Sequence, residues 1–398
     1  MIPFSVARIP RVIYGNGCVN QVCDIVQNYG KNILLVTGTQ SFFGTIKWDR
    51  LCQSLHSANI SYSHFTVDGE PSPRFIDDCV KAYFGSDFNA VVGIGGGSTL
   101  DAAKAIAGLL TVGDSVMDYL EGVGPEKKYR GPSIPFVAVP TTAGTGSEAT
   151  KNAVLSHQGK DGFKKSFRDD KLVAEYALID PELLLSCAKS VVAANGMDAL
   201  TQLIESYVSL KANAFTDALA LSGIQAVSNS LLAWYQSPAD NSHSDIEHAA
   251  QMAYAALMSG ITLAQVGLGS VHGLASPLGA FYPIPHGVVC GTLLAQASEL
   301  NISVMRARDP ENVALHKYAK VAEILCQQSF SQQDEACVAL LNRLQQWTEL
   351  LELPRLSAYC VTHDDVDRIV AHARGSSMQT NPIFLSDSEL VSLLNARI

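Results

Sequence analysis

Short apolar runs alternate with segments of helical spacing throughout the first 140 residues, and this alternation constrains the fold more than any other feature of the chain. The runs have the length and composition of buried strands, and they are residues 32–37, 61–67, 90–94 and 134–139. The segments with helical spacing are residues 48–58, 75–84 and 99–110. Such alternation builds a mainly parallel sheet that is covered by helices on both faces. We therefore predict an α/β domain.

The strand pattern stops near residue 186, and the later apolar patterns all have helical spacing. These later segments are residues 216–235, 246–266, 293–300, 311–328, 334–351, 364–374 and 386–396. Between the first two, residues 236–245 are polar and predict a surface loop. We expect an α/β domain at residues 1–187 and an all-helical domain at residues 188–398. The joint has little linker composition, so we expect the two domains to pack tightly.

Composition narrows the possible partners and the compartment. The formal net charge of −10 argues against nucleic acid or an anionic membrane as a partner. Nine dispersed cysteines without a CxxC pair are typical of reduced thiols and argue against a ribbon-type structural zinc site. The N-terminus has too short an apolar run for a signal peptide, and we find no stretch of about 18 uncharged apolar residues. We expect a cytoplasmic protein.

A glycine-rich loop joins the third predicted strand to the helix that follows it. Gly95, Gly96 and Gly97 let the backbone approach a phosphate closely, and the helix N-terminus offers free N–H groups. The loop is neither G-x-G-x-x-G, because Ser98 takes the last position, nor a Walker loop, because no Gly-Lys-Ser/Thr follows. Alternatively, Ser98 and Asp101 form a capping box. The strand–glycine–helix context favours a phosphate site.

A second polar loop follows the fourth predicted strand. It contains Thr141, Thr142 and Thr145, which can line a nucleotide with small donors. The alternative is an ordinary turn in which Ser147 caps the next segment. Because ligands of parallel sheets bind beyond the carboxyl ends of the strands, the two loops are expected to face one ligand.

Four later residues have the chemistry of a divalent-metal site. Asp198 and Gln202 are four residues apart, so a helix would place them on one face. His272 and His286 each lie next to a glycine. Two imidazoles, a carboxylate and an amide oxygen suit zinc or ferrous iron. Taken singly, the Asp/Gln pair also fits a solvated helix face, and each histidine fits a hydrogen-bonded loop residue.

These motifs, in this order, resemble those of the iron-containing (group III) alcohol dehydrogenases. The segments that carry the resemblance are Gly95–Ser98 with Asp101 and Lys104, Pro140–Glu148, Gly196–Ala199, Pro285–Gly287 and the late Thr380–Pro382. The match runs from about residue 10 to the end. It implies a dinucleotide-binding α/β domain with a mainly parallel sheet, then an all-α metal-binding domain, with the active site in the cleft between them. It also implies a homodimer.

The resemblance assigns roles to individual residues. Gly97 and Ser98 would hold the pyrophosphate, and Thr141, Thr142 and Thr145 would line the nicotinamide side. Lys164 takes the position of the family's cofactor-contacting lysine, sixteen residues before Asp180, with the adjacent Lys165 leaving the register open. The remaining residues that we assign to the cofactor site are Gly38, Gly96, Asp101 and Leu183.

The metal positions of the family fall on Asp198, Gln202, His272 and His286, with two departures from its pattern. Gln202 stands where the family normally has His, and an amide oxygen is a weaker ligand than an imidazole. Ser276, four residues after His272, stands where a second His is common, so a hydroxyl replaces a possible proton relay. Asp198, His272 and His286 alone match the zinc set of the related glycerol dehydrogenases, which shifts our expectation from Fe²⁺ toward Zn²⁺.

The resemblance implies hydride transfer between a carbinol carbon and NAD or NADP, with the metal as a Lewis acid and Asp198, His272, His286 and Ser276 as catalytic groups. The loop after the first predicted strand, Gly38-Thr39-Gln40-Ser41, has no acid to bind an adenosine ribose, so it does not separate NAD from NADP. Asp68 and Glu70 lie in a neighbouring loop.

Several readings of the substrate and the chemistry stay open. The residues Leu268, Phe281, Tyr282 and Ile284 suggest an apolar wall for a simple alcohol, whereas the altered ligand set would also suit a polyol, a sugar or an octulosonate-type sugar acid. A dehydroquinate-synthase-like lyase shares the architecture, but residues 267–286 have none of the Lys and Arg that its anionic substrate needs. A metal-free reductase of the maleylacetate type and a non-enzymatic NAD-binding module are further alternatives.

Overall fold

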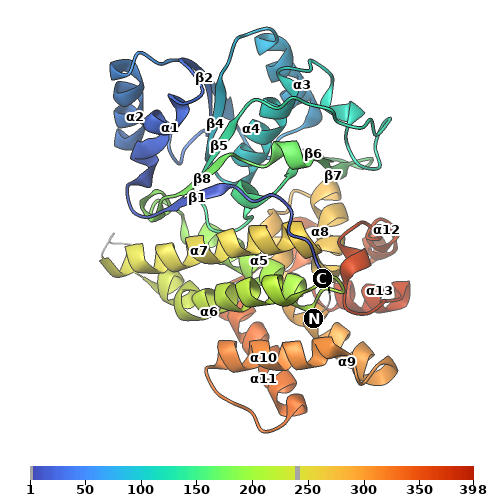
Figure 1. Ribbon diagram of the computed structural model, residues 1–398. Helices are drawn as coiled ribbons and strands as arrows, with labels where there is room; N and C mark the ends of the chain where they lie inside the picture. Colours follow the sequence, from blue (N-terminus) through green and yellow to red (C-terminus); the bar gives the residue numbers. More distant parts are fainter. Residues whose placement is uncertain (1–2, 238–242) are drawn as a thin grey trace.

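The computed structural model describes residues 3–237 and 243–398, and its centre in the first half is a six-stranded sheet (Figure 1). The strands lie in the order β1-β8-β5-β4-β2-β3, and every pairing between them is parallel. Their bounds are β1 Arg11–Tyr14, β2 Asn32–Gly38, β3 Ser61–Val67, β4 Ala90–Gly95, β5 Phe136–Pro140 and β8 Tyr176–Ile179. The four predicted strands are confirmed as β2 to β5, and the predicted parallel sheet with them.

Helices cover both faces of this sheet, as predicted. The helices of the first half are α1 Val22–Val26, α2 Ile46–Ser57, α3 Pro73–Tyr83 and α4 Gly97–Leu109. Alternate residues of β2 belong to different cores, because Ile33 and Leu35 pack on one face whereas Leu34 and Val36 pack on the other. We call the region from β1 to Leu183 the sheet part.

The sheet part also contains an antiparallel hairpin that the apolar pattern did not predict. It is formed by β6 (Asn152–His157) and β7 (Phe163–Arg168). The β7 sequence, Phe-Lys-Lys-Ser-Phe-Arg, is mostly polar, so it does not read as a buried strand. The hairpin lies outside the parallel sheet, and β7 contacts α8 (Ser270–Phe281) of the second half. It therefore carries Lys164 to the boundary between the two halves.

The second half is helical, as predicted, and we call it the helical part. Its helices are α5 Lys189–Val208, α6 Ala214–Gln236, α7 His243–Val266, α8, α9 His286–Arg308, α10 Val313–Cys326, α11 Gln333–Leu350, α12 Val366–Ala371 and α13 Asp387–Asn395. The stretch with Asp198 and Gln202 is the middle of α5. The apolar pattern placed a helix only at 293–300, but α9 begins seven residues earlier, at His286. Of the predicted 236–245 loop, residues 238–242 lie outside the described residues.

α9 is a core helix. Among the described residues, it is the one single helix long and apolar enough to cross a membrane, and 78% of that stretch is buried inside the protein. α7 and α8 satisfy the same criteria only as a pair bent by 100°. α9 packs against α5, α8 and α11, which accounts for apolar residues on all its sides.

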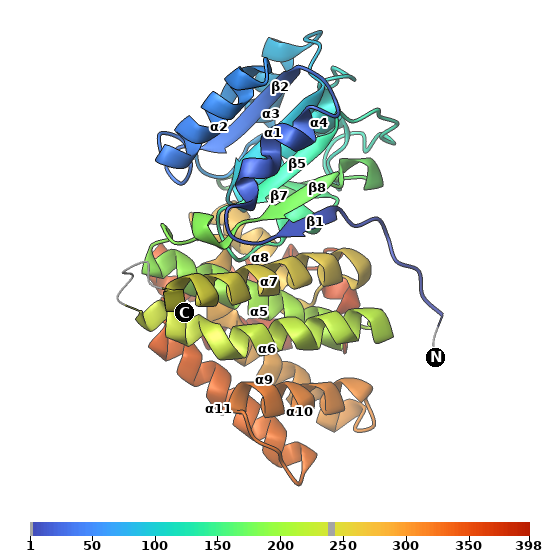
Figure 2. The same ribbon diagram turned by 60° about the vertical axis from the view of Figure 1, so that its left-hand side comes forward.

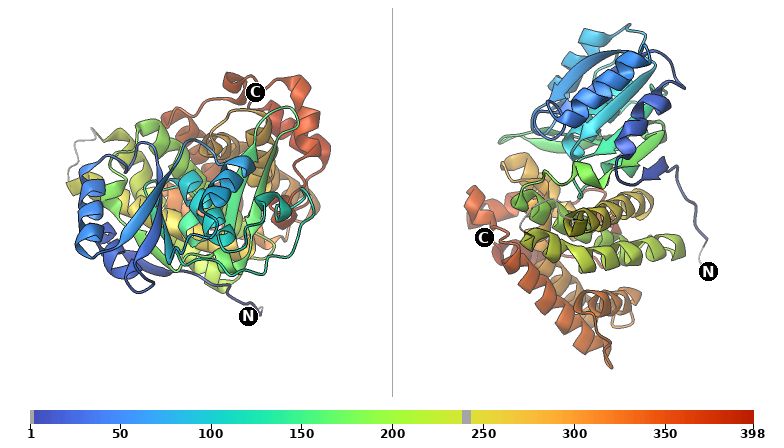
Figure 3. Two further views of the ribbon diagram at one scale, coloured as in Figure 1. Left: turned by 90° about the horizontal axis from the view of Figure 1, so that it is seen from above. Right: turned by 90° about the vertical axis from the view of Figure 1, so that its left-hand side faces the viewer.

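The helical part stacks directly beneath the sheet part, which α7 and α8 both contact (Figure 3). The N-terminal segment before β1 passes the ends of α6 and α7 (Figure 2). There the Ala7 N–H donates to Gln265 Oε1 at 2.6 Å, and the ring of Phe4 stacks on that of Phe215. The segment thus ties the two parts together.

Gly146 and Gly260 form the closest contact between the loop after β5 and α7. A Cβ on Gly260 would lie 2.2 Å from the Gly146 carbonyl oxygen and 2.8 Å from its Cα. Backbone atoms cannot rotate away as a side chain can, so the loop and α7 would have to separate. We expect Gly260→Ala to lower the free energy of unfolding by about 2 kcal/mol and to reduce turnover, because the same loop carries Thr145.

Urea denaturation followed by circular dichroism measures this effect. Gly375→Ala is the matched control for stability, because a Cβ at Gly375 meets nothing within 4 Å. Equal stability of the Gly260→Ala protein and the wild type would show that the two backbones have room to part.

Candidate functional site

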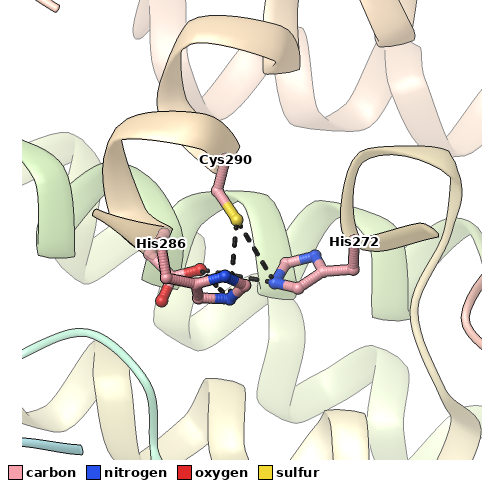
Figure 4. Close-up of side chains that lie close together, drawn as sticks. His272, His286 and Cys290 are labelled. Carbon is pink, nitrogen blue, oxygen red and sulfur yellow. Dashed lines mark hydrogen bonds and ion pairs between the residues drawn. The ribbon is translucent and has the colours of Figure 1, made fainter. Parts of the chain in front are cut away.

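Three helices bring three of the four predicted metal residues together (Figure 4). Asp198 comes from α5, His272 from the first turn of α8, and His286 from the first residue of α9. His272 Nε2 lies 3.3 Å from Asp198 Oδ1, and His286 Nε2 lies 3.8 Å from the same oxygen. Both imidazoles thus point their Nε2 atoms at one carboxylate.

Asp198 is fully buried, and neither of its carboxylate oxygens has a hydrogen-bond partner. His272 Nε2 is within ion-pair distance but makes no hydrogen bond to it, and His286 Nε2 at 3.8 Å is too far away for one. A buried carboxylate without donors is costly unless a cation compensates it. The residues therefore fit a divalent cation, which needs such acceptors and no competing donors.

Glu205 orients His272 from behind. Its Oε2 lies 2.6 Å from His272 Nδ1, and its Oε1 accepts the Val271 N–H at 2.7 Å. With Nδ1 held by a carboxylate, Nε2 is left to face the cluster, an arrangement common for metal-bound histidines. Sequence reasoning missed Glu205, although its position seven residues after Asp198 places it on the same face of α5.

The electrostatic environment prepares the cluster for a cation. Burial favours neutral Asp198, but His286 and His272 outweigh it and hold the pKa of the carboxyl below its ordinary value. Burial, opposed by Asp198, lowers the pKa of His286 to about 4. For His272, burial is outweighed by Cys290 and Glu205, and its pKa lies well above the ordinary value. Asp198 is therefore ionised and His286 neutral near pH 7, the forms that bind a metal, which would displace the proton of His272.

Cys290 also belongs to the cluster, and sequence reasoning missed it. Its Sγ lies 3.6 Å from His272 Nε2 and 3.7 Å from His286 Nε2 (Figure 4). Burial raises the pKa of the free thiol to about 12. The available signal was its spacing, because a residue four after His286 on a helix lies on the same face.

The two altered family positions are both engaged in other contacts. Gln202 Oε1 lies 2.7 Å from the Ser259 hydroxyl, which is also 2.8 Å from the Ala256 carbonyl and has one hydrogen to donate. Ser276 Oγ donates to the Lys164 carbonyl at 3.0 Å. Gln202 and Ser276 nevertheless both line the cavity beside the histidines.

One cavity of about 610 Å³ connects the metal residues with the glycine loop. Gly97, Ser98 and Thr145 line it from the sheet part, and Gln202, His272 and His286 line it from the helical part. The loops after β4 and β5 meet at its upper side because these strands are neighbours and end at the same edge.

The glycine loop is built for close approach. A Cβ on Gly97 would lie 2.6 Å from Thr145 Cγ2, and one on Gly95 would lie 2.5 Å from Thr99. α4 begins at Gly97 with Gly96 as its N-cap and no side-chain cap, so the capping-box alternative for Ser98 and Asp101 is wrong. The free N–H groups of this turn therefore stay available to a ligand.

The other predicted cofactor residues lie at different depths. Thr141 is buried and its hydroxyl donates to Ser41 Oγ at 3.1 Å, while Thr142 faces Gly96. Gly38 faces Thr99, at the end of β2 beside the start of α4. Leu183 is buried in the core and is not among the residues that line the cavity.

Asp101 contributes to a buried polar cluster rather than to a helix cap. It lines the cavity, accepts the Val154 N–H at 3.0 Å, and accepts a hydrogen bond from the Ser147 hydroxyl. The fully buried Lys104 lies 3.4 Å from it. The alternative in which Ser147 caps the following turn is also wrong, because the N-cap there is Gly146.

Basic residues line the cavity, although none comes from residues 267–286. Lys164 pairs with Glu70 at 2.7 Å, Arg168 pairs with Glu121 at 3.1 Å, and Lys165 and Arg374 also line the wall. Lys164 and Lys165 both line the cavity. Their positions therefore do not decide which of the two is the family's cofactor-contacting lysine. Glu70, bound to Lys164, is not free to bind a ribose.

The predicted apolar wall is largely wrong. Leu268 lines the cavity together with Leu263, but Phe281, Tyr282 and Ile284 do not. Ile284 is buried in a core cluster, and the Phe281 ring packs under the Arg368 guanidinium, 3.9 Å from its centroid. Spacing along the chain could not distinguish side chains at the cavity from those behind it.

Comparisons with known proteins agree with this geometry. The family model for iron-containing alcohol dehydrogenases matches residues 10–181, and the C-terminal model of the Fe-containing alcohol dehydrogenase family matches residues 192–398. The chain is 32% identical to alcohol dehydrogenase 4 of Schizosaccharomyces pombe, over 99% of this chain and 89% of that protein. It is 30% identical to a choline dehydrogenase of Bacillus subtilis, over 94% of this chain and 90% of that one. The solved structure of an alcohol dehydrogenase from Oenococcus oeni superposes with a TM-score of 0.86, at 26% identity, covering 100% of both chains.

Proposed function

The chain belongs to the iron-containing alcohol dehydrogenase family and is an oxidoreductase, and we propose that it interconverts an alcohol and its aldehyde or ketone with NAD or NADP. One observation carries the proposal: a single cavity is lined by the glycine loop on one side and by His272 and His286 on the other. A dinucleotide held at the loop and an alcohol held at the histidines would therefore meet.

Asp198, His272 and His286 would hold one divalent cation, Fe²⁺ or Zn²⁺. Their ligand atoms lie close together, and the buried carboxylate oxygens of Asp198 have no hydrogen-bond partner. When bound, the cation supplies Lewis acidity that polarises the oxygen of the substrate. The chain's own contribution is orientation. Glu205 fixes the ring of His272, and the start of α9 fixes His286.

The residues around the cavity would position the reactants. The close Gly97–Thr145 contact holds the two loops together, and the Gly146–Gly260 contact holds the loop after β5 against α7, so the reacting groups would be kept within reach. The Ser276 hydroxyl donates a hydrogen bond to the Lys164 carbonyl, so its side chain would have to rotate before it could relay a proton. His372, which sequence reasoning missed, lines the cavity with Nδ1 bonded to the Arg368 carbonyl, which leaves Nε2 to accept a proton.

The loop after β2 does not distinguish NAD from NADP, so we propose either as the cofactor. Gly38 to Ser41 contain no acid, and Glu70 is paired with Lys164. Because the β2 loop has no acid and Glu70 is paired, these residues strongly favour neither a 2′-hydroxyl nor a 2′-phosphate. We expect kcat/KM values for NAD and NADP within about tenfold of each other, which corresponds to about 1.4 kcal/mol of discrimination.

The cavity wall supports a polar alcohol as the substrate. Apolar contacts come from Leu263 and Leu268, whereas Lys165 adds positive charge and Arg168 is paired with Glu121. Lys165 has no ion-pair partner among the described residues. This observation keeps a second candidate, oxidation of an anionic sugar-acid alcohol of the octulosonate type. Membership of a dehydrogenase family removes the lyase alternative, and the donor-free Asp198 argues against a metal-free reductase or a binding module.

An absorbance screen at the reduced-nicotinamide band tests the function. Simple alcohols, polyols, neutral sugars and sugar acids are each offered with NAD or NADP, after loading with Fe²⁺, Zn²⁺ or no metal. We expect metal-dependent turnover with at least one alcohol class. No turnover with any of them in fully metal-loaded protein would count against the proposal.

The identity of the residue at position 202 is expected to tune metal affinity. Gln202→His would replace an amide oxygen, which already contacts Ser259, by an imidazole on the same face of α5. We expect metal to be retained about tenfold longer on dialysis against a chelator, measured by elemental analysis. Gln225→His, at an exposed position on α6, is the control. Unchanged retention in Gln202→His would place residue 202 outside the ligand set.

We also propose a cytoplasmic homodimer with a domain boundary at Cys187/Ala188, between the last turn of the sheet part and α5. The dimer is supported by exposed apolar side chains along β1, an edge strand, and along the segment before it. They are Phe4, Val6, Ile9, Val12 and Tyr14. An open edge with apolar neighbours is a common site of strand pairing. Light scattering after size exclusion, with Val12→Lys as the variant expected to dissociate, tests this assembly.

A further inference from the structure

Cys290 is the least expected member of the metal cluster. It is fully buried on α9, one turn after His286, and its Sγ points between the two imidazoles (Figure 4). Donor atoms of Asp198, His272, His286 and Cys290 all lie within 4.8 Å of one another. Independently of the cysteine, the donor-free carboxylate of Asp198 indicates that a cation belongs between these side chains.

The distances match a four-coordinate site. Zn–S and Zn–N bonds of about 2.3 and 2.0 Å at tetrahedral angles place sulfur about 3.5 Å from each nitrogen and place nitrogen about 3.3 Å from an oxygen ligand. The observed Sγ–Nε2 separations are 3.6 Å to His272 and 3.7 Å to His286. The observed Nε2–Oδ1 separations to Asp198 are 3.3 and 3.8 Å. These four separations match those of a tetrahedral site, and all four donor atoms lie within 4.8 Å of one another.

Gln202 is a poorer candidate for the fourth position. Its amide oxygen already contacts the Ser259 hydroxyl, and it is neutral and weakly donating. A thiolate is a charged, soft ligand that zinc prefers and that ferrous iron in oxygen- and nitrogen-rich sites does not require. The chain therefore has Gln202 on α5 where the family has a histidine, and it has Cys290 on α9 at the same cluster.

We propose that Cys290 Sγ is the fourth protein ligand of the metal, in place of the residue at position 202, and that it makes the site selective for Zn²⁺ over Fe²⁺. This inference rests on the metal centre of the proposed function. Binding of the cation would displace the thiol proton to solvent, as for other cysteine ligands. Four protein donors leave the substrate oxygen a fifth position, to which catalytic zinc can expand.

Cobalt substitution tests the ligand directly, because a thiolate bound to Co²⁺ gives an intense charge-transfer band in the near ultraviolet that nitrogen and oxygen ligands do not. The full-length protein is stripped of metal and titrated with Co²⁺ alone. The wild type should show the band at one equivalent. Cys290→Ser, which is nearly isosteric, should bind Co²⁺ without the band. Cys337→Ser, another fully buried cysteine on α11, should keep the band at wild-type intensity.

Competition between Zn²⁺ and Fe²⁺ under anaerobic conditions tests the selectivity. We expect Cys290→Ser to lose Zn²⁺ affinity by about 100-fold or more and to change Fe²⁺ affinity much less, while Gln202→Ala and Cys337→Ser lose little of either. Circular dichroism checks that Cys290→Ser is folded, and Cys290→Ala serves as a second variant. A charge-transfer band that survives in both Cys290 variants would overturn the proposal.

The two levels of the argument fail separately. Stoichiometric metal and alcohol-dependent turnover without a thiolate band in the wild type would reject Cys290 as a ligand and leave the proposed function intact. No stoichiometric metal and no turnover in any form would reject the proposed function itself. Equal loss of Zn²⁺ and Fe²⁺ affinity in Cys290→Ser would keep the ligand but reject its role in selectivity.

Discussion

Replacing Asp198 by alanine is expected to abolish both metal retention and turnover. Asp198 supplies the only full negative charge that contacts both histidines of the cluster in the described residues, and its two oxygens have no other partner. Without it, two imidazoles and a buried thiol remain, and the carboxylate charge that compensates a buried cation is lost. Loss of the Lewis acid should lower kcat/KM by at least about 10³-fold, since such charge stabilisation is worth several kcal/mol.

The measurement combines elemental analysis with turnover of the best alcohol found in the screen. His286→Ala is a second variant, expected to behave in the same way because it removes a proposed ligand that lines the cavity. Asp217→Ala, on the helical part and paired with Lys317 at 2.8 Å, is the control for removal of an acid outside the cluster. Full activity and full metal content in both Asp198→Ala and His286→Ala would refute the assignment of the site.

Replacing Lys104 by methionine is expected to cause the largest loss of stability of any single change considered. Its ammonium is fully buried and lies 2.6 Å from the Asn152 carbonyl, 2.9 Å from the Ser147 carbonyl and 3.4 Å from Asp101. Methionine keeps the length but leaves these buried acceptors without a donor. Breaking such a buried pair from one side costs about 3–5 kcal/mol.

Burial also affects the ionisation of this cluster, because it lowers the pKa of Lys104 and raises that of the neighbouring Glu148 to about 7. Urea denaturation of metal-free protein near pH 7 measures the loss. Lys151→Met is the matched control, since Lys151 pairs with Asp170 at 2.7 Å on the surface and such pairs contribute about 0–1 kcal/mol. Similar losses in the two variants would mean that the buried contacts of Lys104 contribute nothing special.

The same change should also reach the cofactor site. Asp101, Ser147 and Thr150 contact Lys104 or its partners and also line the cavity. Lys104 therefore connects α4, which follows the glycine loop, to the loop after β5. A rise in KM for the dinucleotide at permissive temperature would accompany the loss of stability.

Much of the fold could be read from the chain because the two halves differ in period. Short β-branched runs identified β2 to β5, and helical spacing identified most of the second half. β1 and β8, four residues each, are too short to give a pattern, and β7 is polar because its face meets the cavity rather than a core. These three strands owe their conformation to neighbours that are distant in sequence.

The candidate site divides in a similar way. Asp198, Gln202, His272 and His286 were found from a family resemblance in which the identity and order of residues suffice. Glu205 lies on α5 with Asp198, and Cys290 lies on α9 with His286, but no motif marks either residue. Only the packing of α5, α8 and α9 shows that they contact the histidines. The basic wall was misjudged for the same reason, since its residues come from β7 and from the segment after α12.

By itself, the amino-acid sequence determined the architecture and the family, since both depend on patterns that repeat or persist along the chain: apolar period, glycine runs and a fixed order of motifs. Only the tertiary structure decided which donor atoms converge, because Asp198, His272 and Cys290 lie on three helices whose relative distances depend on side-chain packing between them. A relative displacement of these helices by about 1 Å would leave every sequence motif intact but would move the ligand atoms out of the positions that a metal needs.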